Sequence, residues 1–301
     1  GGLVAFPTET VYGLGADATN GDAIARLYAT KHRPLLNPLI VHVAEPVHAR
    51  RYGMLDDRAL QLTDAFWPGP LTLVVPQRSD SPIASLATAG LDTVALRCSA
   101  HPVARALIAA AGCPVVAPSA NRSGGVSATL AEHVAADFDG QDIVVIDGGA
   151  SPIGVESTVA AIMANGVVLL RAGAVLVNDI AGVVGAEHVV DRRDRTDDAA
   201  PNAPGQLTSH YAPQAPVRLN ASQVNAGEAL LGFGVSMPPT TGRALNLSAS
   251  GSLEEAAAHL FAHLRALDAM NPTAIAVMPI PDVGLGQAIN DRLRRAAAPT
   301  A

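Results

Sequence analysis

Lysine is almost absent from this chain. Of its 20 basic residues, only Lys31 is a lysine, and the rest are arginines. A lysine ammonium is a compact point charge on a flexible stem, whereas arginine carries a planar fork. We therefore regard Lys31, with Arg33 two residues later, as a candidate binding site for phosphate or carboxylate. The alternative is a surface lysine near a helix C-terminus, where the helix dipole favours cations.

Aromatic residues and cysteines are also scarce. Aromatic residues make up 3% of the chain, although 49% of its residues are hydrophobic. The core must therefore consist mainly of Ala, Val, Leu and Ile, as in α/β proteins. The two cysteines, Cys98 and Cys113, form neither a disulfide framework nor a C-x-x-C pair, which favours a reducing cytoplasm.

Long apolar runs and a positive net charge are missing as well. No apolar run is long enough to span a membrane and no signal segment opens the sequence, so we expect no membrane association. An apolar stretch begins already at Leu3, and a short N-terminal piece is expected to be missing. The net charge of -7 disfavours a broadly basic nucleic-acid binder but allows a local basic cavity.

Several familiar catalytic motifs are not found. The sequence has no G-x-x-x-x-G-K-[ST] phosphate loop and no G-x-S-x-G nucleophile elbow. His259 and His263 have metal-ligand spacing on a predicted helix, but no third ligand is evident, so we interpret them as a solvated face. The remaining hydroxyls, amides and arginines suit phosphate binding and charge stabilisation, with little covalent catalysis by the protein.

Hydrophobic periodicity predicts an α/β fold with more strands than helices, and therefore a mixed sheet. In the first part of the chain, strands are expected at Leu3–Phe6, Leu39–Val43, Leu71–Val75, Thr93–Arg97, Val115–Ala117, Ile143–Ile146, Thr158–Ile162 and Val167–Leu170. Helices are expected at Asp22–Lys31, Arg58–Phe66, Pro102–Ala111, Leu130–Phe138 and Val177–Val184.

A polar, proline-rich stretch from Asp191 to Pro216 divides the chain. We predict a first domain at 1–190, a linker at 191–216 and a smaller α/β domain at 217–301. The last domain is expected to contain strands at Val217–Leu219, Ala229–Phe233, Ala244–Leu247 and Ile275–Ile280. A capping box at Ser252 and Glu255 predicts a helix to about Met270, and a last helix is expected from about Gln287.

Polar clusters follow or interrupt the predicted strands of the first domain, where open α/β sheets bind ligands. Each cluster alone has a plain structural interpretation. Thr10 would serve in a turn, His42 would be a satisfied core histidine, and Arg97 would pair with a carboxylate. Because all of them occur in one half of the chain, we favour a shared binding site.

These clusters, in this order, resemble the YrdC-like threonylcarbamoyl-AMP synthases of the longer, two-domain type. The resemblance rests on Pro-Thr-Glu-Thr-Val-Tyr-Gly-Leu-Gly at 7–15, Lys-x-Arg-Pro at 31–34, Asn-Pro-Leu-Ile-Val-His at 37–42, Ser-Ala-Asn-Arg-Ser-Gly at 119–124, Glu-Ser-Thr-Val at 156–159 and Arg-x-Gly at 171–173. Pro204-Gly205 with His210-Tyr211-Ala212-Pro213 resembles the family's linker, and Asn290-Asp291-Arg292 resembles its C-terminal domain. The chain departs from the pattern at His32, where Gly is frequent, and at Ala172, where Pro is common.

The resemblance implies a YrdC-like twisted mixed sheet with helices around a basic cavity, followed by a small Rossmann-like α/β domain. It implies a nucleotidyltransferase that makes L-threonylcarbamoyladenylate from L-threonine, bicarbonate or CO₂, and ATP, and that releases pyrophosphate. Mg²⁺ is expected to arrive with ATP, and no resident metal site is expected. The product would go to a downstream tRNA threonylcarbamoyl transferase complex in the cytoplasm, with tRNA as an indirect partner.

The resemblance also assigns roles to individual residues. Those expected on ATP are Lys31, Arg33, Asn37, Thr93, Ser119, Ser127, Arg171 and Tyr211, with Lys31 and Arg33 as the catalytic candidates. Those expected to hold threonine or its carbamate are Thr10, His42, Arg97, Ala117 and Ser157. We predict that the linker closes over the nucleotide as a lid and protects an easily hydrolysed anhydride. The alternative is a simple tether.

Two other functions are compatible with such a fold. One is a different carbamoyl-transfer enzyme of the kind that matures hydrogenases, but the zinc-finger and acylphosphatase modules of those enzymes are not found in this sequence. The other is an RNA-binding module, and the acidic net charge argues against it.

Overall fold

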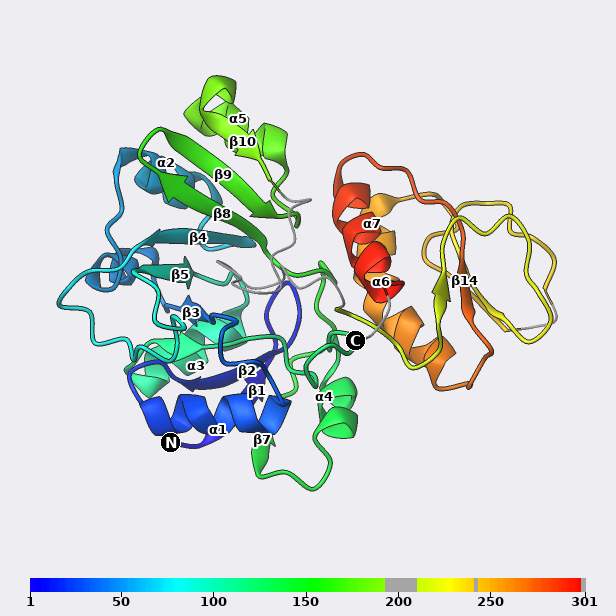
Figure 1. The fold of residues 1–301 in the computed structure, drawn as a ribbon, viewed down its shortest axis with the longest axis horizontal. Helices are drawn as coiled ribbons and strands as arrows, with labels where there is room; N and C mark the ends of the chain where they lie inside the picture. The colour runs from blue at the N-terminus through cyan, green and yellow to red at the C-terminus, as the bar shows by residue number, and fades with distance from the viewer. Residues whose placement is uncertain (193–209, 241–242, 299–301) are drawn as a thin grey trace.

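The computed structural model describes residues 1–192, 210–240 and 243–298, which form two lobes (Figure 1). The larger lobe contains a ten-stranded sheet and the smaller lobe a four-stranded sheet. No helix in these described ranges is both long and apolar enough to cross a bilayer.

The large sheet is mixed, as the sequence predicts, with the strand order β10-β9-β8-β4-β5-β3-β6-β2-β1-β7. It contains parallel pairs such as β3 with β5 and antiparallel pairs such as β4 with β5. Its strands are β1 (Leu3–Phe6), β2 (Gly13–Asp17), β3 (Ile40–His42), β4 (Leu71–Pro76), β5 (Thr93–Arg97), β6 (Val115–Val116), β7 (Ile143–Val145), β8 (Thr158–Met163), β9 (Gly166–Arg171) and β10 (Val189–Asp191).

Five α-helices cover this sheet: α1 (Gly21–Lys31), α2 (Asp57–Phe66), α3 (Pro102–Ala111), α4 (Ala131–Asp137) and α5 (Val177–Val184). Short 3₁₀ helices lie at Pro46–Arg51 and Ala186–His188. Helix α1 begins where the Asn20 side chain accepts a hydrogen bond from the Ala23 amide, and it buries Ile24, Leu27 and Tyr28. It thereby fixes the position of Lys31 in its last turn.

The small sheet is entirely parallel, in the order β11-β14-β12-β13. Its strands are β11 (Val217–Arg218), β12 (Ala229–Gly232), β13 (Ala244–Asn246) and β14 (Ile275–Val277), and it packs against α6 (Leu253–Asp268) and α7 (Leu285–Ala296). The structure thus confirms a small C-terminal α/β unit with a parallel sheet.

Only one of the two hydrogen bonds of the predicted capping box of α6 is present. The Ser252 hydroxyl accepts a hydrogen bond from the Glu255 amide at 3.2 Å, as expected. The Glu255 carboxylate, however, accepts from the Ser248 hydroxyl at 2.5 Å, and the Ser252 amide donates to Ser248 Oγ instead. The preceding turn therefore supplies the second half of the cap.

The two lobes share an apolar interface. Val11, Val126 and Val155 of the large lobe belong to the same buried cluster as α6 and α7. Gly154 has a φ of 77°, and a side chain there would collide with the Ala257 carbonyl of α6. Residues 193–209 of the predicted linker lie outside the described residues, so the domain boundaries stay a prediction.

Candidate active site

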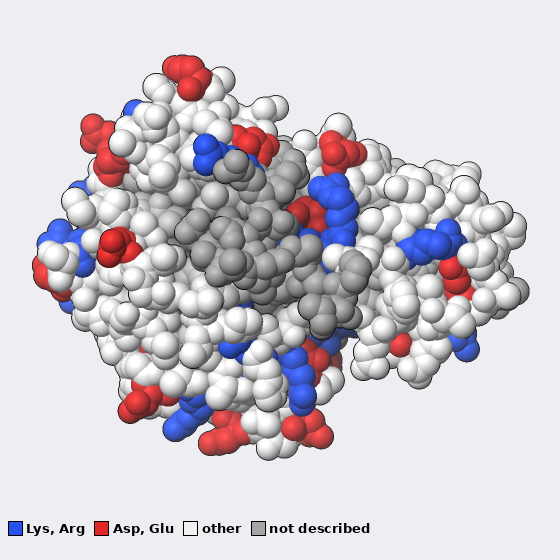
Figure 2. All heavy atoms as spheres, viewed as in Figure 1, with Lys and Arg blue, Asp and Glu red and all other residues white. Residues whose placement is uncertain are grey.

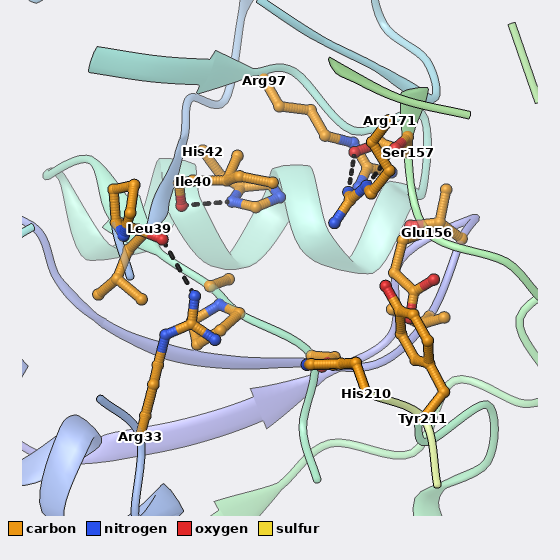
Figure 3. A pocket seen from close by; sticks show the side chains of 16 residues that line it. Arg33, Leu39, Ile40, His42, Arg97, Glu156, Ser157, Arg171, His210 and Tyr211 are labelled. Atoms are coloured by element: carbon orange, nitrogen blue, oxygen red, sulfur yellow. Dashed lines mark hydrogen bonds between the residues drawn. The ribbon is translucent and has the colours of Figure 1, made fainter. Parts of the chain in front are cut away.

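A cavity of about 50 Å³ lies where β3, β5 and β9 end, beside the start of the small lobe (Figure 3). Nine of the predicted site residues line it: Thr10, Arg33, His42, Arg97, Ala117, Ser119, Ser157, Arg171 and Tyr211. Among the other residues in its wall are Val11, Pro38, Pro118, Glu156 and His210. The structure therefore gathers most of the motif residues around one small space.

Three arginines from separate elements reach this cavity. Arg33 follows α1, and it donates to the carbonyl oxygens of Asn37 and Pro38 at 3.3 and 3.1 Å. Arg171 ends β9 and donates to the Ser157 hydroxyl and carbonyl, both at 3.0 Å. Burial lowers the pKa of Arg33 and of Arg171, but an arginine stays protonated at physiological pH. These contacts leave a positive field suited to phosphate or carboxylate groups.

The third arginine, Arg97, is paired with a buried carboxylate. Its Nη2 lies 2.7 Å from Glu9 Oε1, and the Ser99 hydroxyl donates to Glu9 Oε2. Burial alone would raise the pKa of Glu9, but the Arg97 charge and the Ser99 hydrogen bond together lower it to about 2. Glu9 is therefore ionised at neutral pH and orients Arg97 along the cavity wall.

His42 is a neutral ring in this basic surrounding. Its Nδ1 lies 3.2 Å from the Ile40 carbonyl oxygen, and the ring is buried. Burial, together with the nearby Arg97 charge, lowers the pKa of His42 to about 3. A neutral imidazole that donates through Nδ1 is an acceptor at Nε2. In Figure 3 that second nitrogen points toward Ser157 and Arg171.

Tyr211 closes one side of the cavity. Its ring stacks on Phe261 of α6 with centroids 5.5 Å apart, and the Arg292 guanidinium of α7 stands 5.4 Å from the ring centre. The next residue, Ala212, donates its amide to the Gly124 carbonyl of the large lobe at 2.9 Å. Tyr211 therefore contacts both lobes at the edge of the cavity.

Four predicted site residues do not line the cavity. Lys31 is buried, and its Nζ donates to the carbonyls of Ser119, at 2.6 Å, and Asn121. Ser127 donates to Glu156 at 2.5 Å, and Asn37 is buried with no hydrogen bond to its side-chain amide in the described part of the chain. These three residues lie directly behind or beside the wall. Thr93 does not, because it starts β5 at the end opposite Arg97.

Three charged residues that shape the site, Glu9, Glu156 and Arg292, have no role assigned from the sequence. Each of them lies in a motif that carries the family resemblance. Arg292 Nε donates to Glu156 Oε2 at 2.9 Å. These two residues are 136 positions apart. No local pattern indicates such a pair, and only the docking of the small lobe brings it together.

The fold and the cavity define a two-lobed α/β protein with an arginine-rich, anion-binding centre. Residues 1–173 match the family described as Telomere recombination, and residues 175–298 match the C-terminal domain of threonylcarbamoyl-AMP synthase. The chain belongs to the threonylcarbamoyl-AMP synthase family.

Individual relatives agree with this assignment. The threonylcarbamoyl-AMP synthase of Bacillus subtilis is 42% identical over 310 residues, which cover 98% of this chain and 89% of the relative. The Pyrococcus abyssi synthase is 39% identical, over 99% of this chain and 91% of the relative. The crystal structure of P. abyssi Sua5 complexed with L-threonine superposes with a TM-score of 0.90 and 37% identity, over 98% of this chain and 90% of that one.

Proposed function

We propose that this chain synthesises L-threonylcarbamoyladenylate from L-threonine, bicarbonate or CO₂, and ATP, releases pyrophosphate, and thereby serves the threonylcarbamoyladenosine modification of tRNA. One observation carries this proposal: Arg33, Arg97 and Arg171 converge on one cavity together with the hydroxyls of Thr10, Ser119 and Ser157. Such a set binds two anionic reactants without a protein nucleophile.

The proposed chemistry joins two anions. The threonine amine attacks the carbon of CO₂ or bicarbonate and forms a carbamate. A proton is released when CO₂ reacts, and water is released when bicarbonate reacts. A carbamate oxygen then attacks the α-phosphorus of ATP, and the bond to pyrophosphate breaks. Fixed cations hold the mutually repelling groups in line, and this positioning supplies much of the rate enhancement.

The geometry suggests that the two substrates bind on opposite sides of the cavity. Arg97, held by Glu9, and the acceptor nitrogen of His42 lie on the side where we place threonine and its carbamate. Arg33 lies on the opposite side of the view, where we place the ATP phosphates (Figure 3). Tyr211 would then cover the nucleotide and exclude water from the mixed anhydride.

Mg²⁺ fits this proposal best as part of the substrate. Glu156, which lines the cavity, pairs with Arg292, and Glu9, which contacts the cavity-lining Arg97, pairs with that arginine. Within the described ranges, no cluster of three or more His, Cys, Asp or Glu is arranged to hold a metal. We therefore propose that Mg²⁺ enters on the ATP phosphates and keeps most of its ligands from phosphate and water.

The product is a reactive anhydride, so a downstream tRNA threonylcarbamoyl transferase is proposed as its recipient. Direct RNA binding by this chain is the weaker candidate. Figure 2 shows basic and acidic side chains interspersed over the visible face rather than a continuous basic surface.

The test is a pyrophosphate-release assay with full-length chain, ATP, L-threonine and bicarbonate. Synthesis predicts release that requires all three substrates together with Mg²⁺. Release that continues without threonine would indicate a simple ATP pyrophosphatase and would overturn the proposal. A filter-binding titration with tRNA at several salt concentrations tests the RNA-binding alternative separately.

A further inference from the structure

Arg292 of α7 is completely buried, and its charged group lies between the two lobes. Nε donates to Glu156 at 2.9 Å, and Nη1 donates to Asp291 Oδ2 at 2.8 Å. The guanidinium also stands 5.4 Å from the centre of the Tyr211 ring. One arginine of the small lobe thus contacts two cavity-lining residues of different kinds, a carboxylate and an aromatic ring.

The Glu156 carboxylate has partners on both oxygens. Oε1 accepts from the Ser127 hydroxyl at 2.5 Å, and Oε2 accepts from Arg292. Glu156 borders the same cavity as Arg33 and Arg171. Without a cationic partner, this buried carboxylate would repel a triphosphate in the cavity, because charges interact strongly where water is excluded. An ion pair to Glu156 therefore reduces the repulsion that a triphosphate would meet in this cavity.

The neutralising charge comes from the other lobe. Asp291 pairs with both Arg292 and Arg295, and the Arg295 carbonyl accepts from the His210 amide at 3.4 Å. The end of α7 therefore holds Arg292 in place and also touches the segment that closes the cavity. A chain with an undocked α7 would keep the large-lobe residues that line the cavity, but Glu156 would lose its ion pair with Arg292.

We propose that Arg292 is a positioning residue for the nucleotide: it neutralises and orients Glu156 from behind, so that the cavity accepts ATP only when α7 is docked. This inference rests on the proposed function, because it takes ATP as the ligand of the cavity. Arg292 does not itself line the cavity, so its effect on ATP passes through Glu156.

A second interlobe ion pair offers a matched control. Arg265 of α6 bridges to Asp137 of α4, with Nη2 and Oδ2 2.6 Å apart. Like the pair of Arg292 and Glu156, it joins an arginine of the small lobe to a carboxylate of the large lobe. Neither Arg265 nor Asp137 lines the cavity. An Asp137→Asn variant removes this interlobe ion pair and leaves the charged residues that line the cavity unchanged.

The test measures the dissociation constant of Mg-ATP by titration calorimetry on full-length variants. We expect Arg292→Met to weaken ATP binding at least tenfold, because a buried charge without its partner is costly. Adding Glu156→Gln to that variant should restore binding to within about fivefold of Glu156→Gln alone. Asp137→Asn should stay within about threefold of the wild type. Rescue would show that the unpaired Glu156 charge, and not the lost packing of the Arg292 side chain, weakens ATP binding.

Three results would overturn the proposal: wild-type ATP binding in Arg292→Met, no rescue in the double variant, or an equal loss in Asp137→Asn. If Arg292→Met does not fold, the double variant is compared with Glu156→Gln alone. Equal binding then supports the proposal, and tenfold weaker binding rejects it. Pyrophosphate release by the wild type is measured separately. Its absence would reject the synthase function and leave the ATP-binding comparison intact.

Discussion

Lys31 has a buried structural position in addition to its proximity to the cavity. Its ammonium sits between the carbonyls of Ser119 and Asn121 and so supports the loop that carries Ser119 into the cavity wall. Burial, and then the Arg33 charge, lower the pKa of Lys31 well below its usual value. A compact ammonium fits this slot, whereas a planar guanidinium is larger and prefers fork-shaped partners. This gives a physical reason for a lysine at position 31 in a chain whose other basic residues are arginines.

We therefore predict that Lys31→Arg lowers pyrophosphate release at least tenfold, because the larger group displaces the loop at Ser119. Lys31→Ala should cost about 10²–10³ in rate if the ammonium also stabilises charge on ATP. The matched control is Arg26→Lys, a charge-conserving exchange on the exposed side of the same helix, which should leave the rate unchanged. Near-normal turnover in Lys31→Arg would contradict this explanation.

The pair of Glu9 and Arg97 predicts a specific dependence of stability on pH. The pKa of Glu9 falls from its usual 4.5 to about 2 on folding, so the unfolded chain takes up the proton first as the pH drops. This stabilisation is complete above about pH 5 and is lost toward pH 2, and a shift of this size corresponds to about 3 kcal/mol. Urea unfolding of wild type and Glu9→Gln should show a difference that narrows between pH 5 and 2. A constant difference would show that folding does not shift the pKa of Glu9.

At the scale of single elements, the end of α1 explains one departure from the family pattern. His32 follows the helix with φ 52° and ψ 43°, in the left-handed region that favours glycine. Its amide donates to Ala29, and the Arg33 amide donates to Tyr28, so this conformation turns Arg33 toward the cavity. This backbone conformation favours Gly, which is the residue that the family resemblance leads us to expect at position 32.

His32→Gly should therefore raise the free energy of unfolding by about 0.5–1 kcal/mol, because it removes the strain of a side chain in this region. Ala25→Gly, on the exposed face within the same helix, serves as the control and should lower stability by about 1 kcal/mol. Both values come from urea denaturation. Equal destabilisation by the two glycines would mean that His32 carries no strain.

Elements with strong local patterns were predicted most accurately. The sequence predicted β1, β5, α3 and α5 to the residue, because β-branched runs or amphipathic periods with clear stops mark them. It did not predict β2, whose Gly-Leu-Gly-Ala-Asp has little strand propensity and is held by pairing with β1 and β6. A Cβ on Gly15 would lie 2.8 Å from the Phe6 ring, so this strand requires glycine for close packing.

The candidate site was predictable to the extent that motifs carry it. Nine assigned residues line the cavity, because their motifs end strands or follow helices at one edge of the sheet. The assignment of Thr93 to ATP stays a prediction without support from its position at the far end of β5. The link from Arg292 to Glu156 was not predictable, since it depends on how one lobe docks against the other.

At the scale of the whole molecule, both lobes contribute to the cavity, the small lobe through contacts behind its wall. The large lobe supplies the arginines and hydroxyls, and the small lobe supplies Arg292 and the ring of Phe261 beneath Tyr211. Tyr211 itself has a φ of 62°, which is strained for a bulky residue and costs about 1–3 kcal/mol. Contacts from both lobes must offset that strain. The position of Tyr211 beside the cavity therefore depends on contacts with both lobes.

This dependence predicts how Tyr211 contributes to nucleotide binding. The observed contacts of Tyr211 with His210, Phe261 and Arg292 are made by the ring, which Phe retains and Ala lacks. Tyr211→Phe should bind Mg-ATP within about threefold of the wild type, and Tyr211→Ala should bind it at least tenfold more weakly, as measured by titration calorimetry. Circular dichroism at the titration temperature checks that both variants are folded. If Tyr211→Ala binds ATP as tightly as Tyr211→Phe, the ring is only part of the interlobe core, and closure over the nucleotide must come from another segment.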